Sequence, residues 1–373
     1  EQPEVRKVME WARKIEGFPR HASTHAAGVV IAGEPLTHFT PLQGGGHGET
    51  ALTQYSMEHL ESLGLLKMDF LGLRTLTIIE RAEEWVKDVR FGTAMDDPKT
   101  YELLGQGDTS GVFQLESPGM RRVLKELRPS NFEDIVSVLA LYRPGPMEFI
   151  PDYIAGKQGR RKVNYPHPNL EPVLKETYGI IVYQEQIMQI ASIMAGFSLG
   201  QADLLRRAVS KKKRQLLNEQ RRFFVEGSLR QGYTEEIANR VYDLIVRFAD
   251  YGFPKAHATA YGVLAYRTAF LKANWPVAFM ASCLTAVMGN QTKTAEYVEE
   301  CRKMGVALLP PDVNESRAEF YPERGDAQGS IRFALSAVKN VGTTAIQAIV
   351  KAREEKPFTD ILDFCRRVDL KAC

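Results

Sequence analysis

The sequence has few cysteines, and none of them is spaced as in a zinc ribbon. Cys283, Cys301, Cys365 and Cys373 are the only four in 373 residues, they all lie in the last quarter, and no two form a C-x-x-C pair. Such sparing use of thiols argues against a disulfide framework and fits a reducing compartment. We therefore expect a cytoplasmic protein.

Long apolar runs and an excess of charge of one sign are also missing. No stretch of about eighteen apolar residues occurs and no charged-then-apolar leader opens the chain, so we expect no membrane span, secretion signal or membrane partner. Lys and Arg number 48 against 46 Asp and Glu, a net charge of +2 that singles out no partner. The composition, with 44% hydrophobic and 25% charged residues, excludes disorder along the whole chain.

The apolar spacing predicts a small β-containing piece followed by a large helical region. Residues 1–16 have the period of an amphipathic helix, and residues 27–33 and 64–71 read as short buried strands. A flexible loop is expected at 43–48. Helical spacing begins at Arg74 and continues to about residue 305. The fold class is thus α+β and mainly α-helical.

Turn-forming motifs divide the helical region. They are RPGP (143–146), YPHP (165–168) and YGFPKAH (251–257). A small mixed segment follows a boundary near 308–314. Since the chain begins with Glu1 rather than Met and ends at Cys373 without a closing signal, we interpret it as an internal piece of a longer protein.

The first candidate for chemistry is KMDF (67–70), in which Lys67 and Asp69 would share one face of a strand. A carboxylate on a rigid strand suits a hard metal ion such as Mg²⁺, and a lysine beside it could meet a phosphate as a point charge. The alternative is a solvated Lys–Asp pair at a strand end. A magnesium site usually needs a second carboxylate, and none is evident near Asp69.

A run of basic residues without an acid spans 204–218. Such a cluster attracts polyanions with salt-dependent affinity, whereas the alternative is a solvated helix face. The absence of interleaved acids favours phosphate, because solvated helices usually mix charge signs. The basic residues are Arg206, Arg207, Lys211, Lys212, Lys213 and Arg214.

Polar side chains also gather at the turn YGFPKAHATAYG (251–262). Lys255, His257 and Tyr261 lie where this turn opens a helix, whose free N–H groups could bind an anion. His257 could donate a proton or hydrogen-bond a phosphate. The alternative is a helix-start turn with a packed tyrosine.

Two other segments leave their alternatives open. Gln184 in YGIIVYQEQIMQI (178–190) could contact a base or sugar edge, or could belong to a capped core helix. Arg143 in LYRPGP (141–146) is a guanidinium on a stiff loop, suited to a phosphate or to a structural carboxylate. The sequence does not separate these readings.

Two weaker signals lie near the ends of the chain. His21 and His25 are four residues apart, but no third ligand is evident nearby and the segment enters an apolar strand, so a metal site is not favoured there. Residues 338–352 resemble half of a helix-hairpin-helix, a motif that can present backbone N–H groups to phosphate without reading sequence.

Together these segments resemble one family over almost the whole chain, the bacterial DNA polymerase III alpha subunits, which are C-family replicases. The segments occur in the family's order and several are long and specific. They are HASTHAAGVVIA, GLLKMDFLGLRTLTII, GVFQLESPGM, LYRPGP, YGIIVYQEQIMQIA, LLRRAVSKKK and YGFPKAHATAYG.

The resemblance implies a fold and a domain order. The palm of these polymerases is similar to the polymerase-beta-like nucleotidyltransferase fold, and a large helical fingers domain follows it. Carried over to this chain, residues 1–20 would end the thumb and 21–74 would form the C-terminal half of the palm. Residues 75–310 would be fingers, and 311–373 the end of the fingers with a helix-hairpin-helix-like region.

The resemblance also implies site residues. KMDFLGL matches the third of three metal-binding aspartates, so Asp69 is the expected catalytic metal ligand, and Lys67 matches a palm lysine near the incoming triphosphate. Other residues fall in fingers blocks that close over the nucleotide. They are Arg206, Arg207, Lys211, Lys212, Lys213, Lys255, His257 and Tyr261, with Arg143 and Gln184 in similar blocks.

The function implied is nucleotidyl transfer by two Mg²⁺ ions, adding deoxynucleoside triphosphates (dNTPs) to primer-template DNA during bacterial replication. A sliding clamp and other replisome subunits would bind parts absent here. The palm Asp-x-Asp motif is missing from this sequence and would lie upstream, so the isolated piece is expected to be inactive. The alternatives are a non-catalytic helical nucleic-acid-binding module, an inactive paralogue, or an unrelated Mg²⁺-dependent nucleotidyltransferase.

Overall fold

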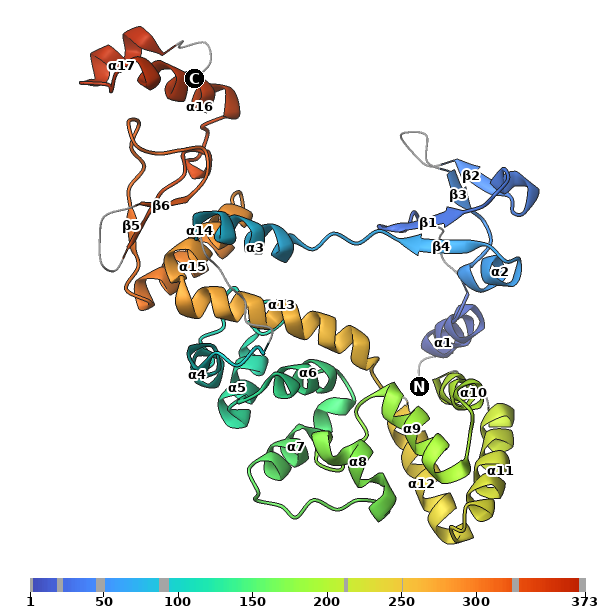
Figure 1. Cartoon of the computed structure of the whole chain (residues 1–373). Helices are drawn as coiled ribbons and strands as arrows, with labels where there is room; N and C mark the ends of the chain where they lie inside the picture. Colours follow the sequence, from blue (N-terminus) through green and yellow to red (C-terminus); the bar gives the residue numbers. More distant parts are fainter. Residues whose placement is uncertain are drawn as a thin grey trace. The chain divides into compact units, whose positions relative to one another are not determined.

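The computed structural model consists of two compact units, Glu1–Leu73 and Arg74–Cys373, which we call the N-terminal unit and the helical unit (Figure 1). Among the described residues, no helix is long and apolar enough to cross a membrane. The structure describes residues 3–18, 23–44, 51–86, 94–210, 214–249, 251–323 and 329–368.

Short strands form two small antiparallel sheets in the N-terminal unit. Its elements are α1 (Pro3–Ile15), β1 (Gly28–Ile31), η1 (Leu36–His38), β2 (Leu42–Gly44), β3 (Ala51–Thr53), α2 (Met57–Ser62) and β4 (Leu66–Asp69). Strand β1 pairs with β4, and β2 pairs with β3. In the first pair Gly28 lies opposite Asp69 and Val30 lies opposite Lys67. Alternate residues share a face, so these four positions lie on one side of the β1–β4 sheet.

The prediction of a flexible loop at 43–48 is wrong for its first two residues. Gln43 and Gly44 belong to β2, because Gln43 pairs with Leu52 of β3 in an antiparallel ladder. The polar and glycine-rich composition that suggested a loop is tolerated here because the strand is short and solvent-exposed. The rest of this expected loop lies outside the described residues.

The strands expected at 27–33 and 64–71 are present, but they are not buried. The face of the β1–β4 sheet away from Lys67 and Asp69 carries apolar side chains that remain 42–56% exposed. They are Val29, Ile31, Leu66 and Met68. The apolar pattern predicted burial, but the described residues leave this face uncovered. A sheet of two strands needs further strands or a packed helix for stability of its own.

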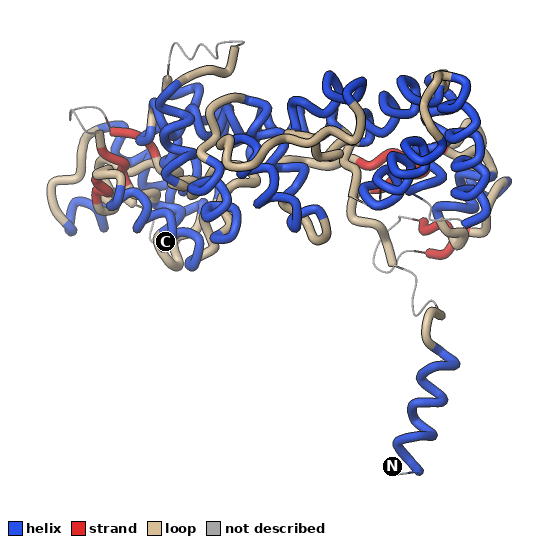
Figure 2. The backbone as a smooth tube through the Cα atoms, turned by 90° about the horizontal axis from the view of Figure 1, so that it is seen from below, coloured by secondary structure: helices blue, strands red, loops and turns tan. Residues whose placement is uncertain are grey.

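Helices dominate the helical unit, as the blue segments of Figure 2 show. The α-helices are α3 (Arg74–Trp85), α4 (Pro98–Gln106), α5 (Pro118–Leu127), α6 (Phe132–Leu141), α7 (Ile150–Lys157), α8 (Glu171–Leu174), α9 (Gln184–Ala195), α10 (Leu199–Ser210), α11 (Arg214–Arg230), α12 (Glu235–Ala249), α13 (Lys255–Asn274), α14 (Pro276–Ala286), α15 (Gln291–Lys303), α16 (Thr343–Glu355) and α17 (Ile361–Arg367). Short 3₁₀ turns are η2 (Pro146–Phe149), η3 (Pro168–Leu170), η4 (Lys175–Thr177) and η5 (Leu335–Ala337). The α+β, mainly α-helical fold class is therefore confirmed.

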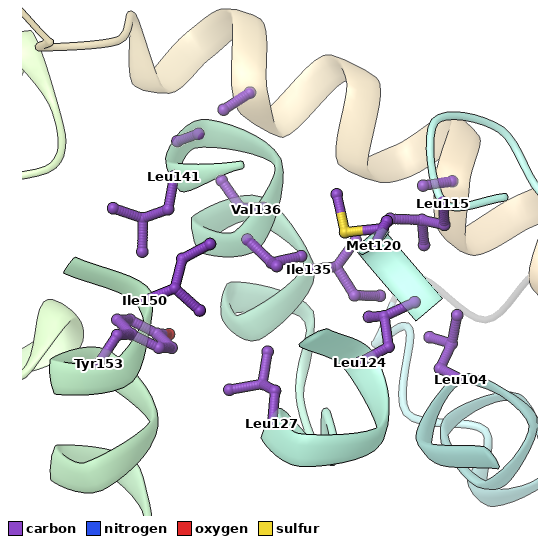
Figure 3. Close-up of a cluster of buried hydrophobic side chains, with 14 of the residues drawn as sticks. Leu104, Leu115, Met120, Leu124, Leu127, Ile135, Val136, Leu141, Ile150 and Tyr153 are labelled. Carbon is purple, nitrogen blue, oxygen red and sulfur yellow. The ribbon is translucent and has the colours of Figure 1, made fainter. Parts of the chain in front are cut away.

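The helix α13 packs along α6 and α4, and a buried apolar cluster lies beside it (Figure 3). Gly262 allows the close approach of α13 to α6, because a Cβ atom there would lie 3.1 Å from a Val136 methyl and 3.2 Å from the Phe132 ring. The N-termini of neighbouring helices are capped by side chains. Asp97 accepts from the N–H of Thr100 at α4, and Asn131 accepts from the N–H of Asp134 at α6. These contacts fix α13, whose first turn carries Lys255 and His257.

A buried ion pair anchors the other end of α13. The Lys272 side chain has no exposed surface, and its Nζ donates to Glu300 Oε1 at 2.5 Å. It also donates to the carbonyl oxygens of Asp108 and Ser110, at 2.7 and 2.9 Å. Burial lowers the pKa of Lys272, which shows that removal from water costs the ammonium group stability. One side chain thus joins α13 to α15 and to the loop after α4.

The last part of the helical unit is a small sheet followed by two helices. The sheet has the order β5-β7-β6, with β5 (Ala307–Leu309) parallel to β7 (Ser330–Arg332) and β6 (Tyr321–Glu323) antiparallel to it. A separate apolar cluster, which includes Ile346 and Phe358, lies under α16 and α17.

Candidate functional site

In the N-terminal unit, Lys67 and Asp69 lie on the same face of β4, as strand alternation predicts. Lys67 Nζ donates to Asp69 Oδ1 at 2.7 Å, with 19% and 44% of the two side chains exposed. This hydrogen bond lowers the pKa of Asp69 below its usual value. The carboxylate is therefore ionised at neutral pH and open to solvent, as a ligand for a cation must be.

A histidine and a glycine frame this pair. His25 Nδ1 accepts hydrogen bonds from the backbone N–H groups of Ala27, at 3.1 Å, and Gly28, at 2.6 Å. A Cβ atom on Gly28 would lie 2.6 Å from Lys67 Cε, 2.8 Å from His25 Nδ1 and 2.9 Å from Asp69 Oδ1. The three side chains therefore converge on the space that the missing methyl group leaves. The sequence singled out His25 only as a disfavoured metal ligand, and His21 lies outside the described residues.

In the helical unit, two distant segments are joined by a short parallel bridge. Tyr183 pairs with Phe253. The N–H of Phe253 donates to the carbonyl of Val182 at 3.1 Å, and the N–H of Gln184 donates to the carbonyl of Phe253 at 3.0 Å. The start of α9 and the turn before α13 therefore lie side by side. This bridge brings Gln184 and Lys255 into one region, although no local sequence pattern pairs their two segments.

Arg143 supports this bridge through backbone contacts. Its Nη2 donates to the carbonyl of Tyr251 at 2.7 Å and its Nε to the carbonyl of Ala140 at 2.9 Å. The guanidinium carbon lies 4.2 Å from the centre of the Phe253 ring. Burial lowers the pKa of Arg143. In this structure these contacts are to backbone and ring, and they hold the turn before α13.

A second set of hydrogen bonds runs from the turn before α13 through Gln184 and Arg206 to the carboxylate of Asp203. Gln184 Oε1 accepts from Arg206 Nη1 at 3.2 Å, while its Nε2 donates to the carbonyl of Gly252 at 3.2 Å. Asp203 accepts from Arg206 Nη2 and from Arg207 Nε, each at 2.7 Å. Asp203 lies one residue before the acid-free 204–218 stretch. Asp203 therefore partly neutralises the start of the basic run, although it lies just outside residues 204–218.

Lys255 is held by two glutamates. Its Nζ contacts Glu176 at 2.7 Å, and its backbone N–H donates to Glu185 at 2.8 and 3.0 Å. The expectation of a free N–H is therefore wrong at the first residue of α13, because a carboxylate from α9 already accepts it. The Nζ atom also lies 5.4 Å from the centre of the Tyr183 ring. A phosphate at Lys255 would compete with Glu176.

His257 and Tyr261 form a row of rings on the first turns of α13. The His257 ring centre lies 5.2 Å from that of Phe253 and 4.2 Å from that of Tyr261. Tyr261 in turn lies 5.1 Å from Phe113. His257 is exposed and Tyr261 is half-buried. An exposed ring at the end of such a row can stack on or hydrogen-bond a ligand.

The structure does not place every residue of the basic run. Lys211, Lys212 and Lys213 lie outside the described residues, and nothing is stated of the Arg214 side chain. The acids Glu176 and Asp203 were missed by the sequence analysis, and Glu185, although part of the candidate segment 178–190, was given no role there. Only Asp203 could have been found from local sequence, because it lies three and four residues before Arg206 and Arg207, the spacing of ion pairs on one helix face.

Comparison with known protein families settles the relationship of this chain. Residues 1–72 match the family model described as bacterial DNA polymerase III alpha NTPase domain, and residues 75–232 match that of the bacterial DNA polymerase III alpha subunit finger domain. The chain belongs to the bacterial DNA polymerase III alpha subunit family. Residues 305–373 match a helix-hairpin-helix motif.

Curated relatives of this polymerase family cover nearly the whole chain. The DNA polymerase III subunit alpha of Bacillus subtilis (strain 168) is 56% identical over 99% of the chain. That of Halalkalibacterium halodurans is 52% identical over 98%, and that of Staphylococcus aureus (strain MRSA252) is 50% identical over 95%. The chain spans 33–34% of the length of these relatives.

The magnesium that the polymerase family implies needs several oxygen ligands. Mg²⁺ prefers octahedral oxygen coordination, usually from more than one carboxylate with substrate phosphates and water. Among the described residues, no group of three or more His, Cys, Asp or Glu side chains could hold a metal ion. The described residues by themselves therefore do not fit a complete magnesium site, although the Asp69 carboxylate is ionised and exposed.

Proposed function

We propose that this chain supplies one catalytic carboxylate and the nucleotide-binding fingers of a DNA-directed DNA polymerase. The full-length protein would add deoxynucleotides to the 3′ end of a primer during bacterial DNA replication. The observation that carries the proposal is the Lys67–Asp69 pair, joined at 2.7 Å on β4 within the residues that match the NTPase-domain model. Within this proposal, residues 1–20 end a thumb, 21–74 belong to a palm and 75–310 form fingers.

Asp69 and Lys67 have complementary roles in this proposal. In the full-length protein Asp69 would be one of three aspartates that hold two Mg²⁺ ions, which would supply Lewis-acid chemistry for nucleotidyl transfer. Lys67 holds the Asp69 carboxylate in place through its hydrogen bond. A lysine beside that carboxylate also offers a positive charge to the triphosphate.

The fingers residues bind the nucleotide and its phosphates in this proposal. Lys255, Arg206 and Arg207 provide charge, His257 and Tyr261 provide a row of rings whose His257 end is exposed, and Gln184 orients Arg206. Arg143 holds the turn that leads into α13, the helix that carries Lys255, His257 and Tyr261. Lys211, Lys212 and Lys213 extend the positive charge. The carboxylates of Glu176 and Asp203 keep the cations positioned until phosphate oxygens replace them.

The first test compares the isolated chain with the full-length protein in primer extension. We expect template-dependent synthesis by the full-length protein and none by this chain with Mg²⁺ and all four dNTPs. The reason is that one carboxylate does not hold two divalent ions against water. Extension by the isolated chain would overturn its predicted inactivity, and a full-length protein without synthesis would favour a non-catalytic nucleic-acid-binding module or an inactive paralogue.

The second test addresses the fingers through Lys255. In the full-length protein, Lys255→Met should raise the KM for the incoming dNTP about tenfold, because one charge-assisted hydrogen bond to phosphate is lost. The matched control is Lys293→Met. Lys293 has the same 40% side-chain exposure and a 2.7 Å contact to Glu296, but it lies on α15. An equal KM for both variants would return Lys255 to a purely structural role.

A further inference from the structure

The backbone contacts of the His25 ring identify its tautomer. Nδ1 lies 2.6 Å from the Gly28 nitrogen and 3.1 Å from the Ala27 nitrogen, and both are N–H donors. A ring nitrogen accepts only through a lone pair, so Nδ1 carries no proton. The neutral ring therefore holds its single proton on Nε2.

The two donors belong to the point where β1 begins to pair with β4. The carbonyl of Ala27 accepts from the N–H of Phe70 at 2.9 Å, and Gly28 lies directly opposite Asp69. His25 therefore holds the same two peptides that set the position of Asp69 across the ladder. No other described side chain is recorded as a hydrogen-bond partner of these two N–H groups.

Gly28 completes this arrangement by having no side chain. The methyl group of an alanine there would meet Lys67, His25 and Asp69, each closer than 3.0 Å. Lys67 alone could move aside, because its chain is long and flexible. The His25 ring and the short Asp69 side chain would need the backbone to shift. The contact between Lys67 and Asp69 thus depends on the absence of a side chain at Gly28 and on the His25 ring, which holds the Gly28 N–H.

We propose that His25 is a positioning residue for polymerisation, which acts through Nδ1 on the start of β1 and thereby fixes the Lys67–Asp69 pair. The inference rests on the proposed function and adds a residue to it. His25 is not a catalytic residue in this proposal, because its described contacts are to backbone. Its loss should lower kcat by a larger factor than it raises the KM for dNTP, because only Lys67 among the proposed phosphate-binding groups is displaced while those of the fingers are untouched.

The test replaces His25 by side chains that mimic one ring nitrogen each. In the full-length polymerase, His25→Asn keeps an oxygen acceptor at the place of Nδ1, His25→Gln moves it to the place of Nε2, and His25→Ala removes it. We expect a loss in kcat of about 10- to 100-fold for the Ala and Gln variants, the range found for residues that orient active-site ligands. The Asn variant should stay within about threefold of the parent.

Gly28→Ala gives an independent variant with a matched control. It should lower kcat as strongly as His25→Ala, whereas Gly33→Ala should not, because a Cβ atom at Gly33 meets nothing within 4 Å. The ring nitrogen signals of His25 in the ¹⁵N NMR spectrum of this chain add a readout that does not depend on activity. They should report the neutral tautomer with its proton on Nε2.

The outcomes separate this inference from the proposed function. A proton on Nδ1, equal kcat for the Asn and Gln variants, or parent-like kcat for His25→Ala would each overturn the positioning role. A polymerase that stays active without the Asp69 carboxylate would instead overturn the function proposed for the palm, whatever the result at His25.

Discussion

Asp69→Asn in the full-length polymerase should reduce nucleotide incorporation by about 10³-fold or more while primer-template binding stays nearly intact. Loss of one member of a catalytic group that acts as a unit removes most of its effect. Asparagine has the size of aspartate, and its oxygen can still accept from Lys67 Nζ, which now contacts Asp69 at 2.7 Å. The geometry of β4 is therefore kept, and only the negative charge is lost. Single-turnover incorporation and equilibrium binding of labelled primer-template measure the two effects separately.

Asp152→Asn provides the control for this experiment. Asp152 is also paired with a cation, Arg161, and its side chain is 50% exposed against 44% for Asp69. It lies in the helical unit, on α7, and should be neutral for synthesis. If Asp69→Asn retained the parent rate, or if Asp152→Asn lost activity equally, the assignment of Asp69 as a metal ligand would not stand.

The sequence was informative about β4 because strand geometry is local. Alternation alone places Lys67 and Asp69 on one face, and their 2.7 Å contact confirms it. The same pattern could not show that the described residues leave the opposite face of β1 and β4 uncovered. Burial depends on what packs against a strand, and that partner is not encoded in the strand's own residues.

The helical unit was predictable only in part, because its contacts join distant segments. The bridge between Tyr183 and Phe253 spans seventy residues of sequence, and no local period signals it. Glu185 and Lys255 are equally distant, yet the glutamate occupies the N–H where a free helix start was expected. The sequence shows where the Lys and Arg residues lie along the chain, but only the fold shows which carboxylates pair with them.

The buried Lys272 is the clearest case of a residue that composition hides, and its loss should have the largest effect on stability. We expect Lys272→Met to lower the free energy of unfolding of the helical unit by about 3–5 kcal/mol, the cost of breaking a buried pair from one side. Glu300 would keep a charge without its partner, and the carbonyls of Asp108 and Ser110 would lose a donor. Urea denaturation followed by fluorescence of Trp275, directly after α13, measures the change.

A second variant and a control make this prediction specific to the buried pair. Lys272→Met combined with Glu300→Leu should recover part of the loss, because removal of both charges leaves no buried ion without a partner. Lys293→Met breaks a lysine–glutamate contact that also involves α15, but with 40% and 51% of its side chains exposed it should cost less than about 1 kcal/mol. Equal losses for Lys272→Met and Lys293→Met would mean that burial does not set the strength of these pairs. A double variant less stable than Lys272→Met would show that Glu300 stabilises the fold even without its lysine, and the anchoring of α13 would then need another explanation.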